Sequence, residues 1–176
     1  MKKILAFGAS TSSGSINRRL ANYAAGLVSG VYVTELDLGE FSLPLYSEDE
    51  EKVNGIPSDA QCFKDLILEH DGLVVSLAEH NGSYTAAFKN LYDWTSRIDQ
   101  NVWAGKPMLL LSTSPGGRGG ATVLAAAHET FSRMGGDIQA SFSLPSFYEH
   151  FIDGVIVDEV LNSQLKKAAA ALANAP

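Results

Sequence analysis

Three loops of this sequence are rich in glycine, serine and asparagine, and each one follows a short apolar run. They read GASTSSGS at residues 8–15, EHNGSY at residues 79–84 and SPGGRGG at residues 114–120. Small side chains let a ligand approach the backbone closely, and hydroxyl and N–H groups donate hydrogen bonds to anions. The three loops therefore indicate a binding site for a ligand that carries an anionic group.

The first loop has the composition and position of a phosphate-binding loop. An apolar run ends at Gly8 and a helical pattern begins near Ser15, so unpaired N–H groups and the positive end of a helix dipole would meet in one small volume. Additional hydroxyl donors come from Ser10, Thr11, Ser12 and Ser13. A serine-rich segment that only caps the helix is the alternative interpretation.

Two common phosphate motifs are absent from this loop. A P-loop requires a lysine followed by serine or threonine after its second glycine, whereas Gly14 is followed by Ser15 and Ile16. The dinucleotide fingerprint requires a third nearby glycine, which is missing. Without that fingerprint, we interpret Asp37, at the end of the second predicted strand, as a solvated loop residue.

Short apolar runs alternate with segments of helical periodicity, which is the pattern of a parallel sheet wrapped by crossover helices. The predicted strands are residues 3–8, 31–36, 72–78, 107–113 and 137–143, and the last has the alternation of an edge strand. Helices are predicted after Ser15, after a capping box at residues 58–61, and over residues 85–96, 120–134 and 157–173.

This alternation predicts an α/β fold, a single doubly wound domain over residues 1–176 with helices on both faces of the sheet. A five-stranded unit of this size commonly has the flavodoxin-like strand order 2-1-3-4-5. Ligands of such sheets bind beyond the carboxyl ends of the strands, near the point where the order reverses. The three loops are expected at that edge.

The composition argues against several other classes of function. A net charge of −7 without a basic cluster argues against nucleic acid or an anionic membrane as the main partner. No apolar run has the length of a secretion signal or a membrane span, so we expect a cytoplasmic protein. Cys62, the only cysteine, is expected to be a small buried side chain. The four histidines lack metal-ligand spacing, so no metal site is expected.

Taken together, the three loops resemble those of the NAD(P)H-dependent FMN reductase family, the flavodoxin-like quinone, azo-dye and chromate reductases. The family's phosphate loop, G-S-x-R-x-x-S-x-N, is matched at Ser10, Ser15 and Asn17, although Ala9 replaces the glycine and Ser12 the arginine. Residues 79–84 resemble its acidic residue or proline followed by Y/H-N-G-S-Y/I-P, with Thr85 in place of the closing proline, and residues 114–120 match its S-P-G-G-x-G-G.

This resemblance implies a noncovalently bound FMN, with NADPH or NADH as co-substrate and a quinone-like or other small molecule as electron acceptor. It implies phosphate contacts from Ser10, Ser12, Ser15, Ile16 and Asn17, the last three partly through backbone N–H groups. It places the flavin ring beside Glu79, His80, Asn81, Gly82, Ser83 and Tyr84, and beside Ser114, Pro115, Gly116, Gly117 and Arg118. The flavin carries the chemistry, and His80 and Tyr84 are the candidate catalytic side chains.

Several alternatives stay open at the level of the sequence. His80 contributes either its side chain or only its backbone, and Tyr84 either lies near the flavin or packs the following helix against the sheet. Arg118 either contacts a nicotinamide phosphate or a partner subunit, or is solvated. Phe88, Tyr92 and Trp94 have the helical spacing of core or subunit-contact residues. A flavodoxin-type electron carrier and a flavin-free nucleotide-binding module are the alternative functions.

The connection from Asp37 to Pro57 is long for a compact domain and carries an acidic patch. Related reductases form dimers or tetramers whose active sites lie near the subunit boundary. We therefore expect a homodimer or homotetramer, with this connection and the helix that carries Phe88 and Trp94 close to the interface.

Overall fold

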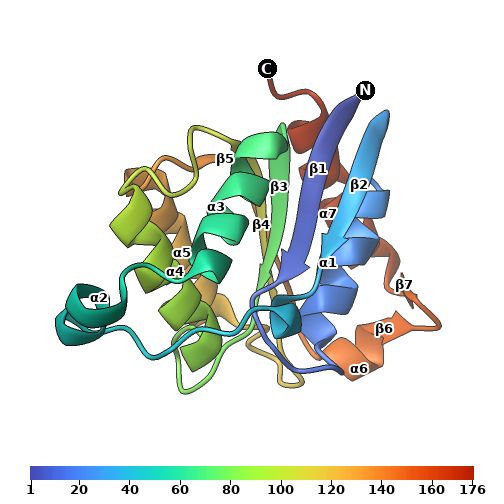
Figure 1. Cartoon of the computed structure of the whole chain (residues 1–176). Helices are drawn as coiled ribbons and strands as arrows, with labels where there is room; N and C mark the ends of the chain where they lie inside the picture. The colour runs from blue at the N-terminus through green and yellow to red at the C-terminus, as the bar shows by residue number, and fades with distance from the viewer.

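A computed structural model describes residues 1–176 and contains a five-stranded parallel sheet (Figure 1). The strands are β1 (Lys2–Gly8), β2 (Val31–Leu36), β3 (Gly72–Leu77), β4 (Pro107–Thr113) and β5 (Asp137–Leu144). They lie in the order β2-β1-β3-β4-β5, and each is parallel to its neighbours. The predicted fold class, strand order and edge position of the fifth strand are confirmed.

Helices cover both faces of the sheet (Figure 1). On one face lie α3 (Ser58–Glu69), α4 (Ala86–Ile98) and α5 (Ala121–Arg133), and on the other lie α1 (Ile16–Gly26) and α7 (Glu159–Ala173). Each face of the sheet has its own apolar core. Along β1, Leu5 and Phe7 are buried in the core beneath α3, α4 and α5, whereas Ile4 and Ala6 are buried in the core beneath α1 and α7. Strands buried on both faces form continuous apolar runs, which is why the sequence pattern located them.

The connection between Asp37 and Pro57 contains two helices that the sequence pattern did not predict. They are the 3-10 helix η1 (Leu38–Glu40) and α2 (Glu48–Asn54). The acidic patch forms the first turn of α2, where the positive end of the helix dipole stabilises carboxylates. Ser47 caps this helix, because its hydroxyl oxygen accepts the N–H of Glu50 at 3.0 Å.

The predicted capping box of α3 is wrong. Pro57 is the N-cap and has no capping side chain, because the chain is already helical at Ser58. The Asp59 carboxylate instead accepts the backbone N–H of Ser42 at 2.7 Å. The start of α3 is therefore tied to the connection that precedes it.

Burial corrects one prediction about single side chains. Cys62 is exposed rather than buried, because the buried stripe of α3 runs along Ala60, Phe63 and Ile67. The aromatic residues of α4 that the sequence pattern singled out, Phe88, Tyr92 and Trp94, are all buried. None of the helices combines the length and apolar character needed to cross a membrane.

Three short elements after β5 were not predicted. They are α6 (Phe147–His150) and the hairpin of β6 (Phe151–Ile152) and β7 (Val155–Ile156). The backbone N–H groups of Ser146 and Phe147 donate to the carbonyls of Gly116 and Ser114, at 2.9 and 3.0 Å. The start of α6 therefore fixes the loop that follows β4.

Candidate functional site

A cavity of about 220 Å³ lies among the loops that follow β1, β3 and β4. Its walls come from four segments of the chain: Ser10, Ser12, Gly14, Ser15, Ile16 and Asn17; Ala78, Glu79 and His80; Thr113, Ser114 and Pro115; and Tyr148 of α6. The predicted convergence of the three loops at the carboxyl ends of the strands thus occurs.

The cavity contains part of the predicted site and several residues outside it. The predicted residues in its walls are Ser10, Ser12, Ser15, Ile16, Asn17, Glu79, His80, Ser114 and Pro115, whereas Asn81, Gly82, Ser83, Tyr84, Gly116, Gly117 and Arg118 lie outside them. Gly14, Ala78 and Thr113 also line the cavity but were not named as candidates, although Gly14 lies within the first loop and the other two directly precede the second and third loops. Tyr148 was missed because α6 itself was not predicted, and its position beyond the fifth strand was the only signal.

The first loop leaves several backbone donors without a partner inside the chain. They are the N–H groups of Thr11, Ser13 and Gly14, together with those of Ile16 and Asn17 in the first turn of α1. Ser15 is the N-cap of α1, and its hydroxyl oxygen accepts the N–H of Arg18 at 3.1 Å. Its hydroxyl proton remains available to a ligand, so this loop can donate many hydrogen bonds to one anion.

Close packing holds α1 against the sheet at this edge. A Cβ at Gly8 would lie 2.3 Å from the backbone nitrogen of Arg18, so only glycine permits this approach. The buried Asn17 side chain donates to the Thr113 carbonyl at 3.1 Å and accepts from the Thr113 N–H and the Ser76 hydroxyl, at 3.0 and 2.7 Å. The Asn17 side chain thus joins α1 to β3 and β4, and its backbone N–H is left for a ligand.

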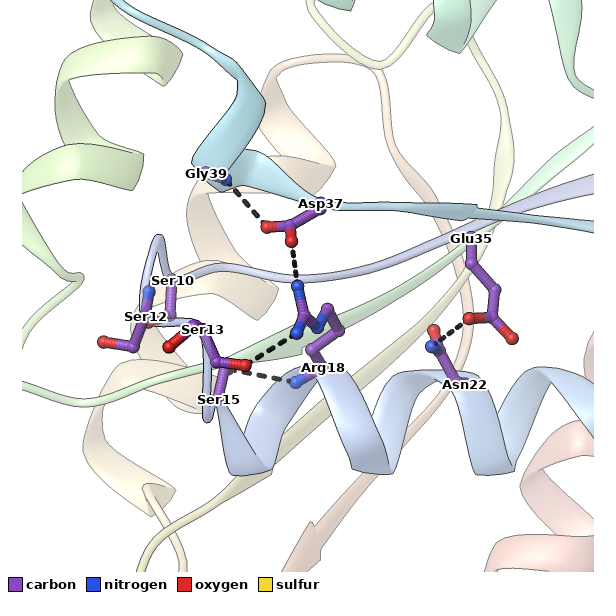
Figure 2. Close-up of polar contacts among 9 residues, drawn as sticks. All are labelled: Ser10, Ser12, Ser13, Ser15, Arg18, Asn22, Glu35, Asp37 and Gly39. Atoms are coloured by element: carbon purple, nitrogen blue, oxygen red, sulfur yellow. Dashed lines mark hydrogen bonds and ion pairs between the residues drawn. The ribbon is translucent and has the colours of Figure 1, made fainter.

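Asp37 is not the solvated loop residue that the sequence suggested. Its carboxylate pairs with the guanidinium of Arg18 and accepts the Gly39 N–H at 2.8 Å (Figure 2). Arg18 also donates from Nη2 to the Ser13 carbonyl at 2.7 Å. The interpretation was wrong because β2 ends beside the first turn of α1, which brings an acid and a base from different elements into contact.

The second loop is a tight turn. His80 and Ser83 exchange backbone hydrogen bonds of 3.0 and 3.1 Å across Asn81 and Gly82, whose φ angles are 52° and 75°. Two successive left-handed residues define a type I′ turn, and asparagine followed by glycine is its preferred sequence. The turn is exposed, with His80 on the side that borders the cavity.

Tyr84 points into the packing between α4 and α5. Its ring is stacked on that of Phe131, with centroids 6.2 Å apart and planes inclined by 4°, and its hydroxyl lies 2.9 Å from that of Thr130. Burial raises the pKa of Tyr84, because the charged phenolate is less well solvated in this packing. These contacts match the packing alternative from the sequence analysis.

Glu79 connects the second loop to α5, the helix that follows the third loop. Its carboxylate accepts the backbone N–H of Val123 at 2.8 Å. The N-cap of α5 is Gly120, which has no capping side chain, so Glu79 supplies the missing acceptor at the positive end of this helix. The exposed Arg118 donates to the Thr122 hydroxyl at 2.9 Å.

Comparison with known proteins identifies the family. Residues 2–149 match the family model described as NADPH-dependent FMN reductase. The chain belongs to this family. It is 37% identical over 128 residues to 2-hydroxy-1,4-benzoquinone reductase from a Burkholderia species, covering 72% of this chain and 67% of that protein. It is 32% identical over 149 residues to NADPH:quinone oxidoreductase from Arabidopsis thaliana, covering 82% of this chain and 74% of that protein.

Solved structures agree with this assignment. FerB, described as a flavoenzyme NAD(P)H:(acceptor) oxidoreductase from Paracoccus denitrificans, has a TM-score of 0.77 at 27% identity, over 99% of this chain and 96% of that chain. A flavodoxin from Pseudomonas aeruginosa shares the fold, with a TM-score of 0.55 at 19% identity over 97% of this chain and 98% of that chain. The predicted family and the enzyme class, an NAD(P)H-dependent oxidoreductase of the FMN reductase type, are confirmed.

Proposed function

We propose that the chain binds FMN noncovalently in the cavity between its three loops, receives a hydride from NADPH or NADH, and passes electrons to a quinone-like small molecule. The observation that carries this proposal is the set of donors without partners between Thr11 and Asn17. A phosphate monoester carries nearly two negative charges at neutral pH, and a helix N-terminus rich in free N–H groups fits such an anion.

The protein's part in the reaction is to bind and orient the cofactor. The hydroxyls of Ser10, Ser12 and Ser15 and the N–H groups of Ile16 and Asn17 would hold the phosphate. When bound, FMN supplies the chemistry of hydride and electron transfer. Family membership supports this enzyme rather than a non-catalytic carrier or a flavin-free module.

The second and third loops would border the flavin ring. We assign ring contacts to residues 79–84 and 114–118, whose turns are mostly exposed and approachable. Of the two candidate catalytic side chains, we favour His80, because it lines the cavity and Tyr84 does not. The Tyr84 hydroxyl is already hydrogen-bonded to Thr130. We therefore expect Tyr84 to hold the preceding turn in place rather than to take part in proton transfer.

The acceptor, the assembly and the location complete the proposal. Both curated relatives are named for quinone substrates, which supports a quinone-like acceptor. We further propose that residues 1–176 act as one FMN-binding domain in a cytoplasmic homodimer or homotetramer. The connection that contains α2, together with α4, would lie near the subunit boundary.

Binding and kinetics test the proposal together. Fluorescence titration of the protein should give a dissociation constant for FMN about a hundredfold below that for riboflavin, which lacks the phosphate, because several hydrogen bonds to a charged group are lost. With NADPH and benzoquinone as substrates, double-reciprocal plots should be parallel. Equal affinities for FMN and riboflavin would refute the assigned phosphate site.

A further inference from the structure

The side chains of residues 8–15 bring no positive charge into the first loop, yet a cation reaches this loop from α1. Arg18 donates from Nη2 to the Ser13 carbonyl at 2.7 Å, and its Nη1 pairs with the Asp37 carboxylate (Figure 2). Its backbone N–H donates to the hydroxyl oxygen of Ser15 at 3.1 Å. One residue therefore contacts the middle of the loop, its end and the neighbouring strand connection.

Asp37 is itself fixed by the backbone. It is the N-cap of η1, and its Oδ1 accepts the Gly39 N–H at 2.8 Å while Oδ2 faces Arg18. The carboxylate offsets the charge of the guanidinium, and neither Arg18 nor Asp37 is part of the cavity wall. Arg18 thus contacts the loop without lining the cavity.

The hydrogen bond from Arg18 to the Ser13 carbonyl fixes the direction of the Gly14 N–H. In a trans peptide the carbonyl of one residue and the N–H of the next point in opposite directions. Because Arg18 holds the Ser13 carbonyl, the Gly14 N–H points the other way, and this N–H has no partner inside the chain. Gly14 lies in the cavity wall.

We propose that Arg18 and Asp37 form a brace that holds the loop in its phosphate-binding shape before the ligand arrives. This inference rests on the proposed FMN site. A loop ordered in advance costs less to immobilise on binding, so the brace would raise affinity without touching the phosphate. Arg18 and Asp37 are therefore positioning residues, in place of the direct cation that Ser12 cannot provide.

A brace and a simple electrostatic attraction predict opposite effects at Asp37. If Arg18 acted only through its charge, Asp37→Asn would remove the opposing carboxylate and strengthen FMN binding. If the pair is a brace, the same substitution frees the guanidinium to move and weakens FMN binding. The sign of this change separates the two explanations.

The experiment measures dissociation constants of FMN and riboflavin for the full chain and for Arg18→Gln, Asp37→Asn and the double variant. Each single substitution should raise the FMN constant about tenfold, the loss of roughly one charge-assisted hydrogen bond. The riboflavin constant should change less than about twofold, because riboflavin has no phosphate. The double variant should bind FMN no more weakly than the weaker-binding single variant, because each single substitution already breaks the same brace.

A neighbouring pair between α1 and β2 provides the control. Asn22 on α1 donates to the Glu35 carboxylate of β2 at 2.6 Å, one turn further from the loop (Figure 2). Asn22→Ala should leave the FMN-to-riboflavin ratio unchanged. Arg18→Lys, which keeps the charge but cannot bridge two acceptors in the same way, should weaken FMN binding as Arg18→Gln does.

Four results would overturn the brace: tighter FMN binding in Asp37→Asn, full retention of FMN affinity in Arg18→Lys, additive losses in the double variant, or equal losses for FMN and riboflavin. Each of these can occur while the wild-type protein still binds FMN, so the proposed function would survive. A wild-type protein that binds no FMN would instead refute the proposed function and this inference with it.

Discussion

Ser15 caps a helix and also lines the cavity, a combination that the sequence alone could not reveal. It is buried, lines the cavity, and its hydroxyl oxygen caps α1 through the Arg18 N–H. The serine-rich cap and the phosphate loop, which were alternatives at the level of the sequence, are therefore compatible. A hydroxyl accepts with its oxygen and donates its proton, so one side chain can serve both the helix and a ligand.

Substituting Ser15 with alanine should separate these roles. Ser15→Ala should weaken FMN binding and leave riboflavin binding nearly unchanged, because only the phosphate loses a donor. It should also lower the free energy of unfolding by about 1 kcal/mol through the lost cap. Ser47→Ala, which removes the cap of α2 away from the cavity, is the control and should not change FMN affinity. Fluorescence titration and urea denaturation measure the two effects, and an unchanged FMN constant in Ser15→Ala would contradict the first.

At the scale of elements, periodicity predicted what is buried and failed where short elements depend on caps and turns. The five strands and the long helices were located because their apolar patterns reflect two covered faces. α2 was missed although Ser47 and the acids after it form a capping sequence. The β6–β7 hairpin was missed although Asp153 and Gly154, both with positive φ, form its turn.

The candidate site also contains residues that the sequence pattern could predict and residues that it could not. Motif residues at the carboxyl ends of strands could be predicted, because the topology of a parallel sheet brings those ends together. The Arg18–Asp37 pair could not be predicted, because it depends on where β2 ends relative to α1. The contribution of Tyr148 to the cavity depends on α6, which has only four residues and no clear periodicity.

The packing of α4 against α5 should respond to alkaline pH. Burial raises the pKa of Tyr92 to about 12, and its hydroxyl donates to Met134 Sδ at 2.8 Å. Between its ordinary pKa of about 10 and this value, the unfolded chain releases the proton while the folded chain keeps it. The free energy of unfolding should therefore fall with rising pH in that window, by up to about 1.4 kcal/mol per pH unit.

Urea denaturation at several alkaline pH values checks this expectation. Tyr92→Phe should reduce the slope, whereas Tyr32→Phe, at a side chain that is 63% exposed on β2, should not. Part of the slope should persist in Tyr92→Phe, because burial also raises the pKa of Tyr84. An identical slope in wild type and Tyr92→Phe would show that this phenol is not buried as described.

At the scale of the whole molecule, the connection that contains α2 is attached to α4 rather than loose. Trp94 Nε1 donates to the Pro44 carbonyl at 2.7 Å, and Arg97 pairs with Glu51 at 2.9 Å. This attachment leaves Leu45 and Val53 on the surface, 82% and 79% exposed. Because Trp94 and Phe88 are buried within the chain, any subunit contact here would use the connection and the outer face of α4.

Sedimentation should therefore detect a dimer or tetramer at micromolar concentration. Leu45→Lys should shift the protein toward the monomer, because a charge would be buried in the proposed contact. Val160→Lys, at a side chain that is 67% exposed on α7, is the matched control and should not. A wild-type monomer at that concentration would contradict the proposed assembly.

The central claim is that this chain uses bound FMN to pass electrons from a nicotinamide to a quinone-like acceptor. The most direct test mixes the FMN-loaded protein with NADPH, and separately with NADH, in the absence of oxygen, and then adds benzoquinone. We predict that the visible flavin absorbance bleaches far faster than that of free FMN with at least one nicotinamide, and returns when the quinone is added. Protein-bound FMN that bleaches no faster than free FMN with either nicotinamide would contradict the claim.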